Sequence, residues 1–565
     1  MNVNYFFLLN IFISFLSATN YYVATSYGND TNNGTSINTP FKTIAKAASV
    51  MSSGDICYIR QGRYHETVTI NNLDGSSGSA IIFTNYNNER VIMDGTIPIT
   101  STWTQVGSSN IWRTKLSSDI WQLFLDWEEQ VMARWPNAKF SDNTIWDNDN
   151  YWAKGTIDDD ENAYSNGTII DDPYTNSAGT TINLSAAGFD LDETNKQAIA
   201  ILNLGSFRTW SRLVTSHSGG TFNYSTVPNW KTKHHYYFLE GRREFLDQAG
   251  EWWYDTYNNA DSLYYYANNG VDPNRLNFRG KVQSYAFSIT GSEYIQIKNI
   301  EFFGTTVYFS NGDNCVVYGC NFMYPSCSKR MLRTVDTEPE MTKFASGSAG
   351  SAIRNCAFRN TDGTALEMWG GTDTVDNCYF TNIDYSVADN SSIMLTMRMN
   401  GTANVFRKNT VHRTGASATV MVGDAGLVEY NNLYDTGHLQ SDGSMIQFME
   451  DQQDGAICRY NWLHDTEKYG ARFDHSGTAD GTNGTMHHNL AWNCESGGIM
   501  VKGDNHKVYN NTVLNSGSKN DIIVFQVNNG DHASSIIRNN AADKIANHRT
   551  NNVAIDFGTY TNNWN

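Results

Sequence analysis

The sequence is short of charged residues and of strong helix formers. Asp, Glu, Lys and Arg together make up 17% of the 565 residues, whereas Asn, Thr, Gly, Tyr and β-branched residues are plentiful. This composition disfavours long helices and favours strands joined by turns. The chain is long for one globular core, but its length is ordinary for a solenoid, which grows by adding coils.

Positive charge is the scarcer sign. The 40 Lys and Arg residues stand against 58 Asp and Glu, which gives a net charge of −18. Domains that bind nucleic acid are basic, so nucleic acid is excluded as a partner. The sequence also lacks a Gly-rich phosphate loop, and His487-His488 has no further residues at metal-ligand spacing. We therefore expect no cofactor and no metal site.

Long apolar runs are missing after the N-terminus. The run from Tyr5 to Leu16 is followed by Ser17 and Ala18. It is too short to span a bilayer and fits a signal peptide cleaved near Ala18. We expect a secreted or periplasmic protein, a monomer without a membrane segment.

One phrase recurs along the second half of the chain. Y-N-x-L-x-D-T occurs at Tyr430–Thr436 and again at Tyr460–Thr466. A slot in this frame holds Cys or Asn, and from Cys356 to Asn511 it recurs every 22 to 31 residues, enough for a coil of three short strands and three turns. We expect a buried ladder with free thiols, although a disulfide between neighbouring coils is the alternative. The slot residues are Cys320, Cys356, Cys378, Asn409, Asn431, Asn461, Asn489 and Asn511.

Two segments depart from the coil rhythm. Thr39 and Pro40 precede the amphipathic stretch F-K-T-I-A-K-A-A-S-V-M, which predicts a helix that caps the open end of the solenoid. Residues 101–280 are rich in Trp and Tyr, with turn residues between short strand patterns, and predict an antiparallel β insertion. The locally basic run 208–243 either faces an anionic substrate or is a solvated strand face. The expected organisation is a signal peptide (1–18), cap and first coils (19–100), insertion (101–280) and main solenoid (281–565).

The start of the solenoid resembles a known family. GDICYIRQGRYHETVTI, followed by SAIIFTNYNNERVIMDGT, is similar to the opening of secreted right-handed parallel β-helix enzymes that act on polysaccharides, the pectate-lyase-like superfamily. The phrases LFLDWEEQVMARWPN (123–137) and 236–273 look like segments of β-helix glycoside hydrolases such as families 120 and 141. The resemblance implies an all-β, right-handed parallel β-helix and a carbohydrate-active enzyme.

One strand of each coil predicts the working face. Side chains alternate across a strand, so residues beside the inward apolar pairs point outward. The inward pairs are Leu366/Met368, Leu395/Met397, Val420/Val422, Ile446/Phe448, Ala471/Phe473 and Ile499/Val501. We interpret the outward polar stripe as a substrate-binding face, although a salt-bridged sheet would give the same pattern. Its predicted substrate-binding residues are Glu367, Trp369, Arg398, Gln447, Arg472, His475 and Lys502.

Two neighbouring coils hold the richest chemistry. A glycosidase needs two carboxyl groups roughly 5–10 Å apart, and Asp442 and Asp474 lie on adjacent coils within reach of each other. The D-G context of Asp442 and the R-F-D context of Asp474 resemble the contexts of acidic residues in β-helix hydrolases. We hypothesise that this pair is catalytic, with His438 assisting proton transfer and Glu450 as a reserve carboxyl group.

Two rival functions remain open. A polysaccharide lyase would use Lys502, placed like the lysine base of chondroitinase B and alginate lyase, with calcium as an added cofactor. The acidic calcium-ligand run of those enzymes is absent, since W-N-C-E-S-G-G-I-M-V-K offers only Glu495. The other rival is a non-catalytic glycan-binding solenoid. The favoured function is hydrolysis of a polysaccharide, anionic or sulfated, of algal or plant origin.

Overall fold

The structure is a computed structural model that describes residues 18–155, 167–205, 207–227, 236–257, 261–390, 395–475 and 481–564. The predicted signal peptide up to residue 17 and the part of the basic run between 228 and 235 lie outside the described residues. Within the described part of the chain, no helix is long and apolar enough to cross a membrane.

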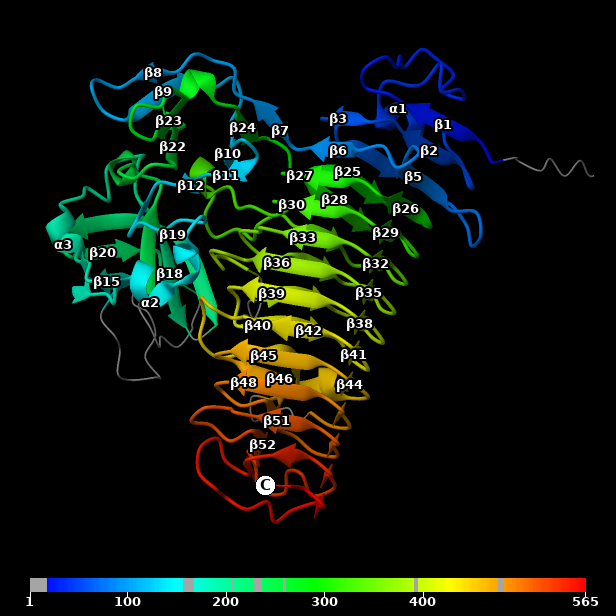
Figure 1. Ribbon diagram of the computed structural model, residues 1–565, viewed down its shortest axis with the longest axis vertical. Coiled ribbons are helices and arrows are strands. Elements are labelled where there is room, and N and C mark those ends of the chain that lie inside the picture. The colour runs from blue at the N-terminus through cyan, green and yellow to red at the C-terminus, as the bar shows by residue number, and fades with distance from the viewer. Residues whose placement is uncertain are drawn as a thin grey trace, which may run out of the picture.

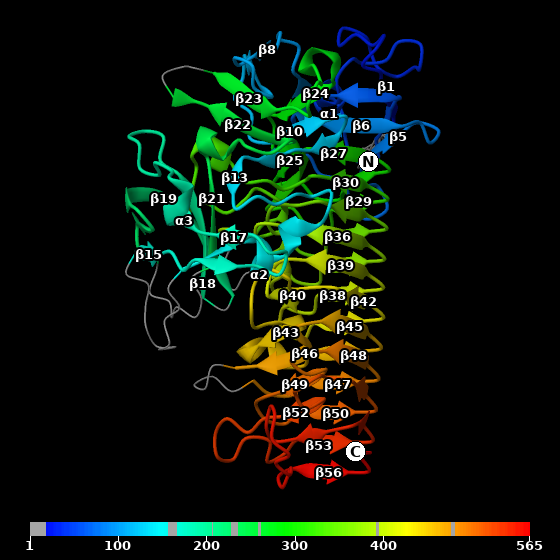
Figure 2. The ribbon, with the colours of Figure 1, turned by 60° about the vertical axis from the view of Figure 1, so that its left-hand side comes forward.

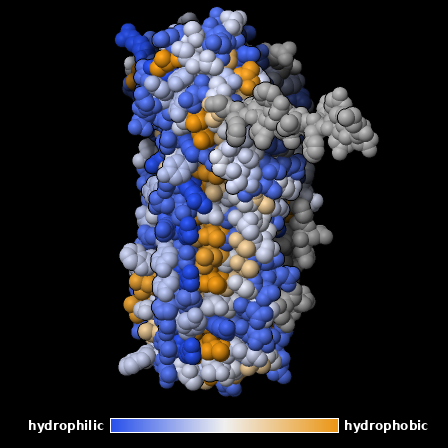
Figure 3. Space-filling model, turned by 90° about the vertical axis from the view of Figure 1, so that its right-hand side faces the viewer, coloured by the Kyte–Doolittle hydropathy of each residue, from blue (hydrophilic) through white to orange (hydrophobic). Residues whose placement is uncertain are grey.

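Three long parallel sheets wind around one core (Figures 1 and 2). Each coil contributes one short strand to each sheet, in the order sheet 1, sheet 2, sheet 3, and pairs in register with the coils before and after it. Like positions therefore stack at ~4.8 Å intervals. On the face shown in Figure 3, hydrophobic and hydrophilic side chains gather into rows along the long axis.

The bounds of the solenoid strands follow, for the described residues. Sheet 1 comprises β1 (Asn20–Val23), β2 (Ile56–Ile59), β5 (Ile81–Asn85), β26 (Ile295–Lys298), β29 (Val316–Tyr318), β32 (Ala352–Arg354), β35 (Thr374–Asp376), β38 (Val405–Arg407), β41 (Leu427–Glu429), β44 (Ile457–Arg459), β47 (Thr485–His487), β50 (Lys507–Tyr509), β53 (Ile536–Arg538) and β56 (Thr559–Thr561). Sheet 2 comprises β3 (Gly62–Tyr64), β6 (Val91–Asp94), β27 (Glu301–Phe303), β30 (Asn321–Met323), β33 (Ala357–Arg359), β36 (Tyr379–Ile383), β39 (Thr410–Thr414), β42 (Asn432–Tyr434), β45 (Trp462–Thr466), β48 (Leu490–Cys494), β51 (Thr512–Leu514) and β54 (Ala541–Ala542). Sheet 3 comprises β4 (Val68–Asn71), β25 (Tyr285–Thr290), β28 (Thr306–Ser310), β31 (Thr342–Phe344), β34 (Leu366–Met368), β37 (Leu395–Met399), β40 (Ala418–Val422), β43 (Ser444–Met449), β46 (Tyr469–Asp474), β49 (Ile499–Val501), β52 (Ile522–Val524) and β55 (Ile545–Ala546).

The predicted slot forms a buried ladder. The Asn461 amide donates to the carbonyl of Val428 (3.0 Å) and to Oδ1 of Asn489 (3.0 Å), while its own Oδ1 accepts from Asn431. The same pattern runs from Asn409 to Asn511, so each Asn satisfies backbone groups of the turn before it. All eight cysteines are buried and free, which confirms the prediction of thiols over bridges.

The capping helix begins four residues later than predicted. α1 spans Ile44–Ala48, and Thr43, not Thr39, accepts the capping hydrogen bond from Lys46. Phe41 bonds to Tyr22 and Ala24 through its backbone, which holds residues 40–42 extended against β1. Ile44 and Ala47 then turn toward the solenoid core, and the Glu66 carboxylate accepts from the first free amides of the helix.

The insertion leaves the solenoid inside one coil. β5 and β6 precede the inserted residues and pair with β26 and β27, which follow them. The coils before and after the insertion therefore stack on each other like any other neighbouring coils. The insertion is antiparallel apart from the β12–β22 pair. Its strands are β7 (Thr96–Pro98), β8 (Thr104–Gln105), β9 (Ile111–Lys115), β10 (Leu123–Leu125), β11 (Glu128–Glu129), β12 (Val131–Met132), β13 (Arg134–Trp135), β14 (Ala153–Lys154), β15 (Thr168–Ile170), β16 (Tyr174–Thr175), β17 (Thr181–Ile182), β18 (Ile199–Gly205), β19 (Arg208–Ser218), β20 (Thr221–Tyr224), β21 (Tyr236–Glu240), β22 (Glu251–Asp255), β23 (Ser262–Tyr266) and β24 (Phe278–Lys281). The other short helices are η1 (Thr144–Trp146), α2 (Asn148–Tyr151), α3 (Leu184–Ala187), η2 (Arg243–Phe245), η4 (Pro273–Arg275), η5 (Arg330–Leu332) and η6 (Glu450–Gln453).

The insertion docks on the long loops between sheets 2 and 3, beside the solenoid in Figures 1 and 2. Arg330 on such a loop is 1% exposed and binds Glu240 of the insertion (3.0 Å) and Asp362 of the next coil (3.2 Å). Further along, Asn203 donates to the carbonyl of Leu439 (2.6 Å). The insertion therefore lies against the loops that lead into sheet 3.

Candidate active site

The outer face of sheet 3 carries a compact polar cluster on β43, β46 and β49. Asp442 stands just before β43 with a positive φ of 52°, followed by Gly443 at 92°. This tight turn, which Asp and Gly tolerate, directs the carboxylate back over the sheet. Oδ1 of Asp442 accepts from the amide of Gly443 (2.7 Å) and from Nη1 of Arg472 (2.8 Å).

Arg472 is the centre of this cluster. Its Nη1 contacts Asp442, its Nη2 lies 3.1 Å from Asp474, and its Nε donates to Oε1 of Gln447 (3.0 Å). Burial acts to lower the pKa of Arg472, but the charges of Asp474 and Asp442 outweigh it and hold the pKa above its usual value. The Arg472 guanidinium thus bridges both predicted carboxylates. This bridge keeps the separation of the two carboxyl groups below the ~9.5 Å upper limit for glycosidase pairs.

Asp474 and Lys502 complete the cluster from neighbouring coils. Nζ of Lys502 lies 2.5 Å from Oδ1 of Asp474 and 3.4 Å from the carbonyl of His475. The side chain of Asp474 is 13% exposed and contacts two cations, whereas that of Asp442 is 35% exposed. The two carboxylates therefore have different surroundings, which is how paired acids acquire different roles.

The predicted outward stripe is interrupted by apolar patches. Met421 and Met449 pack with Leu395 and Ala418 on one side of the cluster, and Met500 packs with Tyr469 and Ile523 on the other. Leu395 was predicted to point inward, and the structure corrects this. β34 pairs Leu366 with Met397 and Met368 with Met399, so Met397 and Met399 form the inward pair.

Three predicted substrate-binding residues form a separate group on β34 and β37. Glu367 is only 1% exposed and binds Nζ of Lys343 (2.7 Å) and the indole of Trp369 (2.8 Å). The guanidinium of Arg398 stacks on Trp369 at 4.5 Å. This group lies two to three strands, or roughly 10–14 Å, from Gln447 on β43.

His438, Glu450 and His475 do not join the carboxylate pair. The imidazole of His438 bonds to Asp435 at the end of sheet 2 (3.0 Å), where it holds the pKa of Asp435 down at about 2. Glu450 begins η6 and is half-buried. His475 is 3% exposed, and its Nε2 lies 4.0 Å from Oδ2 of Asp531. The sequence places these residues near strand ends but does not give the direction of their side chains.

Two supporting residues were missed. The Ser444 hydroxyl donates to Oε1 of Gln447 (2.6 Å), and the ring of Tyr469 lies 5.3 Å from the Arg472 guanidinium. Both stand three residues before the side chain that they support, a spacing that an alternating strand pattern does not predict. Within the described residues, no group of three His, Cys, Asp or Glu could hold a metal ion.

Comparison with known proteins agrees with the three-sheet architecture. A family described as "Right handed beta helix region" matches residues 344–513. A solved structure named "Glycoside hydrolase" covers 87% of this chain and 95% of its own, with a TM-score of 0.57 at 14% identity. The chain is a right-handed parallel β-helix.

Two further proteins are similar to this chain in structure or in sequence. The complex of XylC with xylose covers 97% of this chain and 86% of its own at 13% identity, with a TM-score of 0.49. The uncharacterized protein YwoF of Bacillus subtilis (strain 168) is 41% identical over 68 residues. That match spans 12% of this β-helix chain and only 14% of the relative.

Proposed function

We propose that this β-helix is a secreted, monomeric carbohydrate-active enzyme, a glycoside hydrolase whose carboxyl pair is Asp442 and Asp474. The observation that carries the proposal is the Arg472 guanidinium, which holds one carboxylate from each of two adjacent coils at 2.8 and 3.1 Å. The fold shared with a structure named "Glycoside hydrolase" supports the choice of reaction class by analogy.

The surroundings of the two carboxyl groups suggest their roles. Lys502 and Arg472 both contact the Asp474 carboxylate, at 2.5 and 3.1 Å. Asp474 would then stabilise the positive charge that develops at the anomeric carbon. Asp442 is the more exposed of the two, so we assign to it the donation of the proton to the departing glycosidic oxygen.

We further propose an anionic or sulfated polysaccharide of algal or plant origin as the substrate. Arg472 and Lys502 supply cations at the pair, and Arg398 supplies another farther along the same face. Arginine in particular binds carboxylate and sulfate-like groups through paired hydrogen bonds. The apolar side chains on either side of the cluster offer surface for the faces of sugar rings.

Product analysis on fucans, carrageenans, alginate, pectins and xylans tests the proposal. A hydrolase releases reducing ends without a new ultraviolet absorbance, because water is added across the broken bond. Products with a new C=C absorbance would instead identify a lyase, for which Lys502 and Arg472 are the base and the cation. Binding of a polysaccharide without any product would identify a glycan-binding solenoid and overturn the enzyme proposal.

A further inference from the structure

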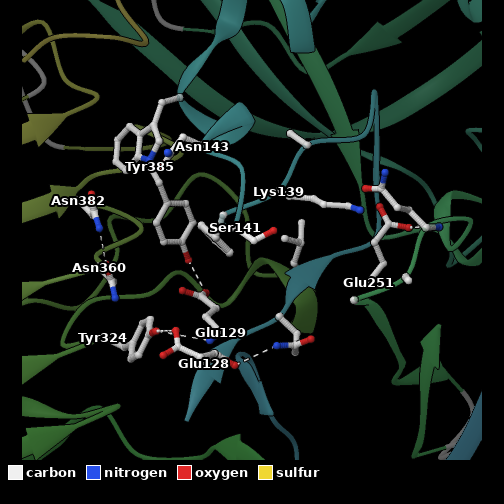
Figure 4. Close-up of a pocket in the computed structure, with 18 residues that line it drawn as sticks. Glu128, Glu129, Lys139, Ser141, Asn143, Glu251, Tyr324, Asn360, Asn382 and Tyr385 are labelled. Carbon is white, nitrogen blue, oxygen red and sulfur yellow. Dashed lines mark hydrogen bonds between the residues drawn. The ribbon is translucent and has the colours of Figure 1, made fainter. Parts of the chain in front are cut away.

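A second polar pocket lies between the insertion and the corner where sheet 2 strands end (Figure 4). Its volume of about 500 Å³ falls in the ~300–1,000 Å³ range of small-molecule sites. The insertion supplies Glu129 on β11 and the 248–251 turn, and the solenoid supplies Tyr324, Asn360 and Tyr385. Neither Asp442 nor Asp474 lines it.

Three acceptor oxygens that line this pocket have no hydrogen-bond partner within the described residues. They are Oε2 of Glu129, Oε1 of Gln248 and Oε1 of Glu251. Glu251 is 1% exposed, and its other oxygen already accepts from the amides of Asp247 and Gln248. Buried polar atoms are costly when they are unpaired, so three around one cavity indicate a ligand with several hydroxyl groups.

The pocket is built to keep its acids uncharged. Burial raises the pKa of Glu129 to about 8, against the opposing hydrogen bonds from Tyr385 and Gln122. Burial also raises the pKa of Glu251 to about 8. At pH 7 both groups are therefore mainly protonated, and each can donate one hydrogen bond and accept others. Glu128 adds a further carboxyl group, and Lys139 is the one cation among the lining residues, so the pocket offers little positive charge to an anionic ligand.

Aromatic and amide side chains shape the remaining walls. The hydroxyl of Tyr385 donates to Oε1 of Glu129 (2.6 Å), and its ring packs edge-on against Phe140 at 4.8 Å. Asn382 donates to Asn360 (3.0 Å) along the solenoid corner, and Trp146 closes another side. Figure 4 shows Tyr385 and Glu129 on one side of the pocket and Glu251 on the other. Aromatic surface beside convergent polar groups suits a sugar ring, which has apolar faces and a hydroxylated edge.

We propose that this pocket binds one uncharged sugar residue, as a site distinct from the carboxylate pair on sheet 3. Hydroxyls of the sugar would hydrogen-bond to the unpartnered oxygens of Glu129, Gln248 and Glu251, donating to Gln248 and accepting from the protonated acids. Because none of these residues belongs to the Asp442–Asp474 cluster, the proposal does not depend on the reaction at that cluster.

Calorimetric titration of the full chain with xylose, glucose, galactose and fucose tests this site, with glucuronate as the charged probe. At least one neutral sugar should bind, and glucuronate should bind at least tenfold more weakly. The Ala249→Trp substitution fills the pocket from the 248–251 turn and should abolish binding. Gln248→Ala removes one acceptor and should weaken binding about tenfold, the effect of one lost hydrogen bond.

The control variant is Asp474→Asn, which should bind the neutral sugar as the wild type does even if hydrolysis is lost. Unfolding midpoints establish that each variant is folded, and Gln248→Ala keeps the test valid if the larger substitution is not tolerated. The proposal is overturned if no neutral sugar binds, if glucuronate binds equally well, or if binding survives both pocket variants. Loss of binding in Asp474→Asn would also overturn it, because the sugar would then occupy the cluster on sheet 3.

Discussion

At the scale of single residues, Arg472 has two functions that can be separated by experiment. It is 6% exposed and neutralises Asp442 and Asp474, so its removal leaves two carboxylates close together without their shared cation. Leaving buried charge without its partner lowers the free energy of unfolding by more than the intact ion pair contributes to it. The residue therefore stabilises the fold as well as arranging the cluster.

Arg472→Met should lower the free energy of unfolding by about 3 kcal/mol, the order found when one partner of a buried ion pair is removed. Denaturant unfolding measures the change. Arg90→Met is the matched control, because Arg90 pairs with Glu301 but is 70% exposed, and exposed pairs contribute roughly 0–1 kcal/mol. Equal losses in the two variants would show that Arg472 is not neutralising buried charge.

Glu251 predicts a pH dependence of stability. Its pKa is about 8 in the folded chain and returns to its ordinary value near 4.5 on unfolding. Between these values the folded state binds the extra proton, so stability falls as pH rises from about 4.5 to about 8. The slope for one such group approaches roughly 1 kcal/mol per pH unit.

Glu251→Gln keeps an acceptor oxygen and removes the titration, so unfolding measured between pH 5 and 8 should show a shallower decline. Glu293→Gln, at an exposed position on the solenoid, should leave the wild-type slope unchanged. A slope that is identical in wild type and Glu251→Gln would contradict the buried, protonated state of Glu251.

At the scale of elements, the Asn ladder is the part of the solenoid that sequence spacing predicts best. A slot that accepts Cys or Asn at intervals of one coil requires a turn in which a small polar side chain bonds to backbone groups, and Asn461 does this on both sides. Strand registers are less predictable. Leu395 begins β37, and only the pairing of β37 with β34 shows that Met399 takes the inward position.

Asn461→Ala should lower the free energy of unfolding by about 3 kcal/mol, because it leaves backbone and side-chain groups of two neighbouring coils unpaired in a dry interior. Asn552→Ala removes an exposed side chain from a surface loop of the solenoid and should change stability by less than ~0.5 kcal/mol. Denaturant unfolding of both variants measures the difference. Equal effects would mean that the ladder contributes no more than surface turns do.

The candidate site was predicted in part, for a physical reason. Asp442, Arg472, Asp474, Gln447 and Lys502 meet because adjacent coils stack at a fixed spacing and strands alternate their faces, and both rules can be applied to a sequence. His438 bonds to Asp435 instead, since a loop residue has no such rule. The Glu129–Glu251 pocket joins segments more than 100 residues apart with the solenoid corner, so no local pattern indicates it.

At the scale of the whole molecule, the insertion and the solenoid are joined by a buried charge network. Arg330 binds Glu240 of the insertion and Asp362 of the solenoid, and all three are at most 5% exposed. The charges of Asp362 and Glu240 hold the pKa of Arg330 well above its usual value against the opposing effect of burial. This charge network, the joint between the insertion and the solenoid, lies beside the loops that carry the chain into sheet 3.

Arg330→Met should lower the free energy of separating the insertion from the solenoid by about 3 kcal/mol. The equilibrium constant for that separation should rise roughly 100-fold. Hydrogen exchange should then quicken in β18 and β21 of the insertion, while the distant coils β50 to β53 keep wild-type protection. Arg243→Met, at an exposed position in the insertion, is the control and should leave both regions unchanged. Uniformly faster exchange over the whole chain would contradict a local joint.

The central claim is tested most directly by the turnover of Asp474→Asn on a polysaccharide that the wild type cleaves. We predict a loss of roughly 1,000-fold, within the range for removal of a catalytic acid or base, with an unfolding midpoint near that of the wild type. Asp451→Asn, which alters an exposed carboxylate on η6 beside the cluster, should retain full turnover. Full turnover in Asp474→Asn would contradict the assignment of the carboxylate pair to this face of the β-helix.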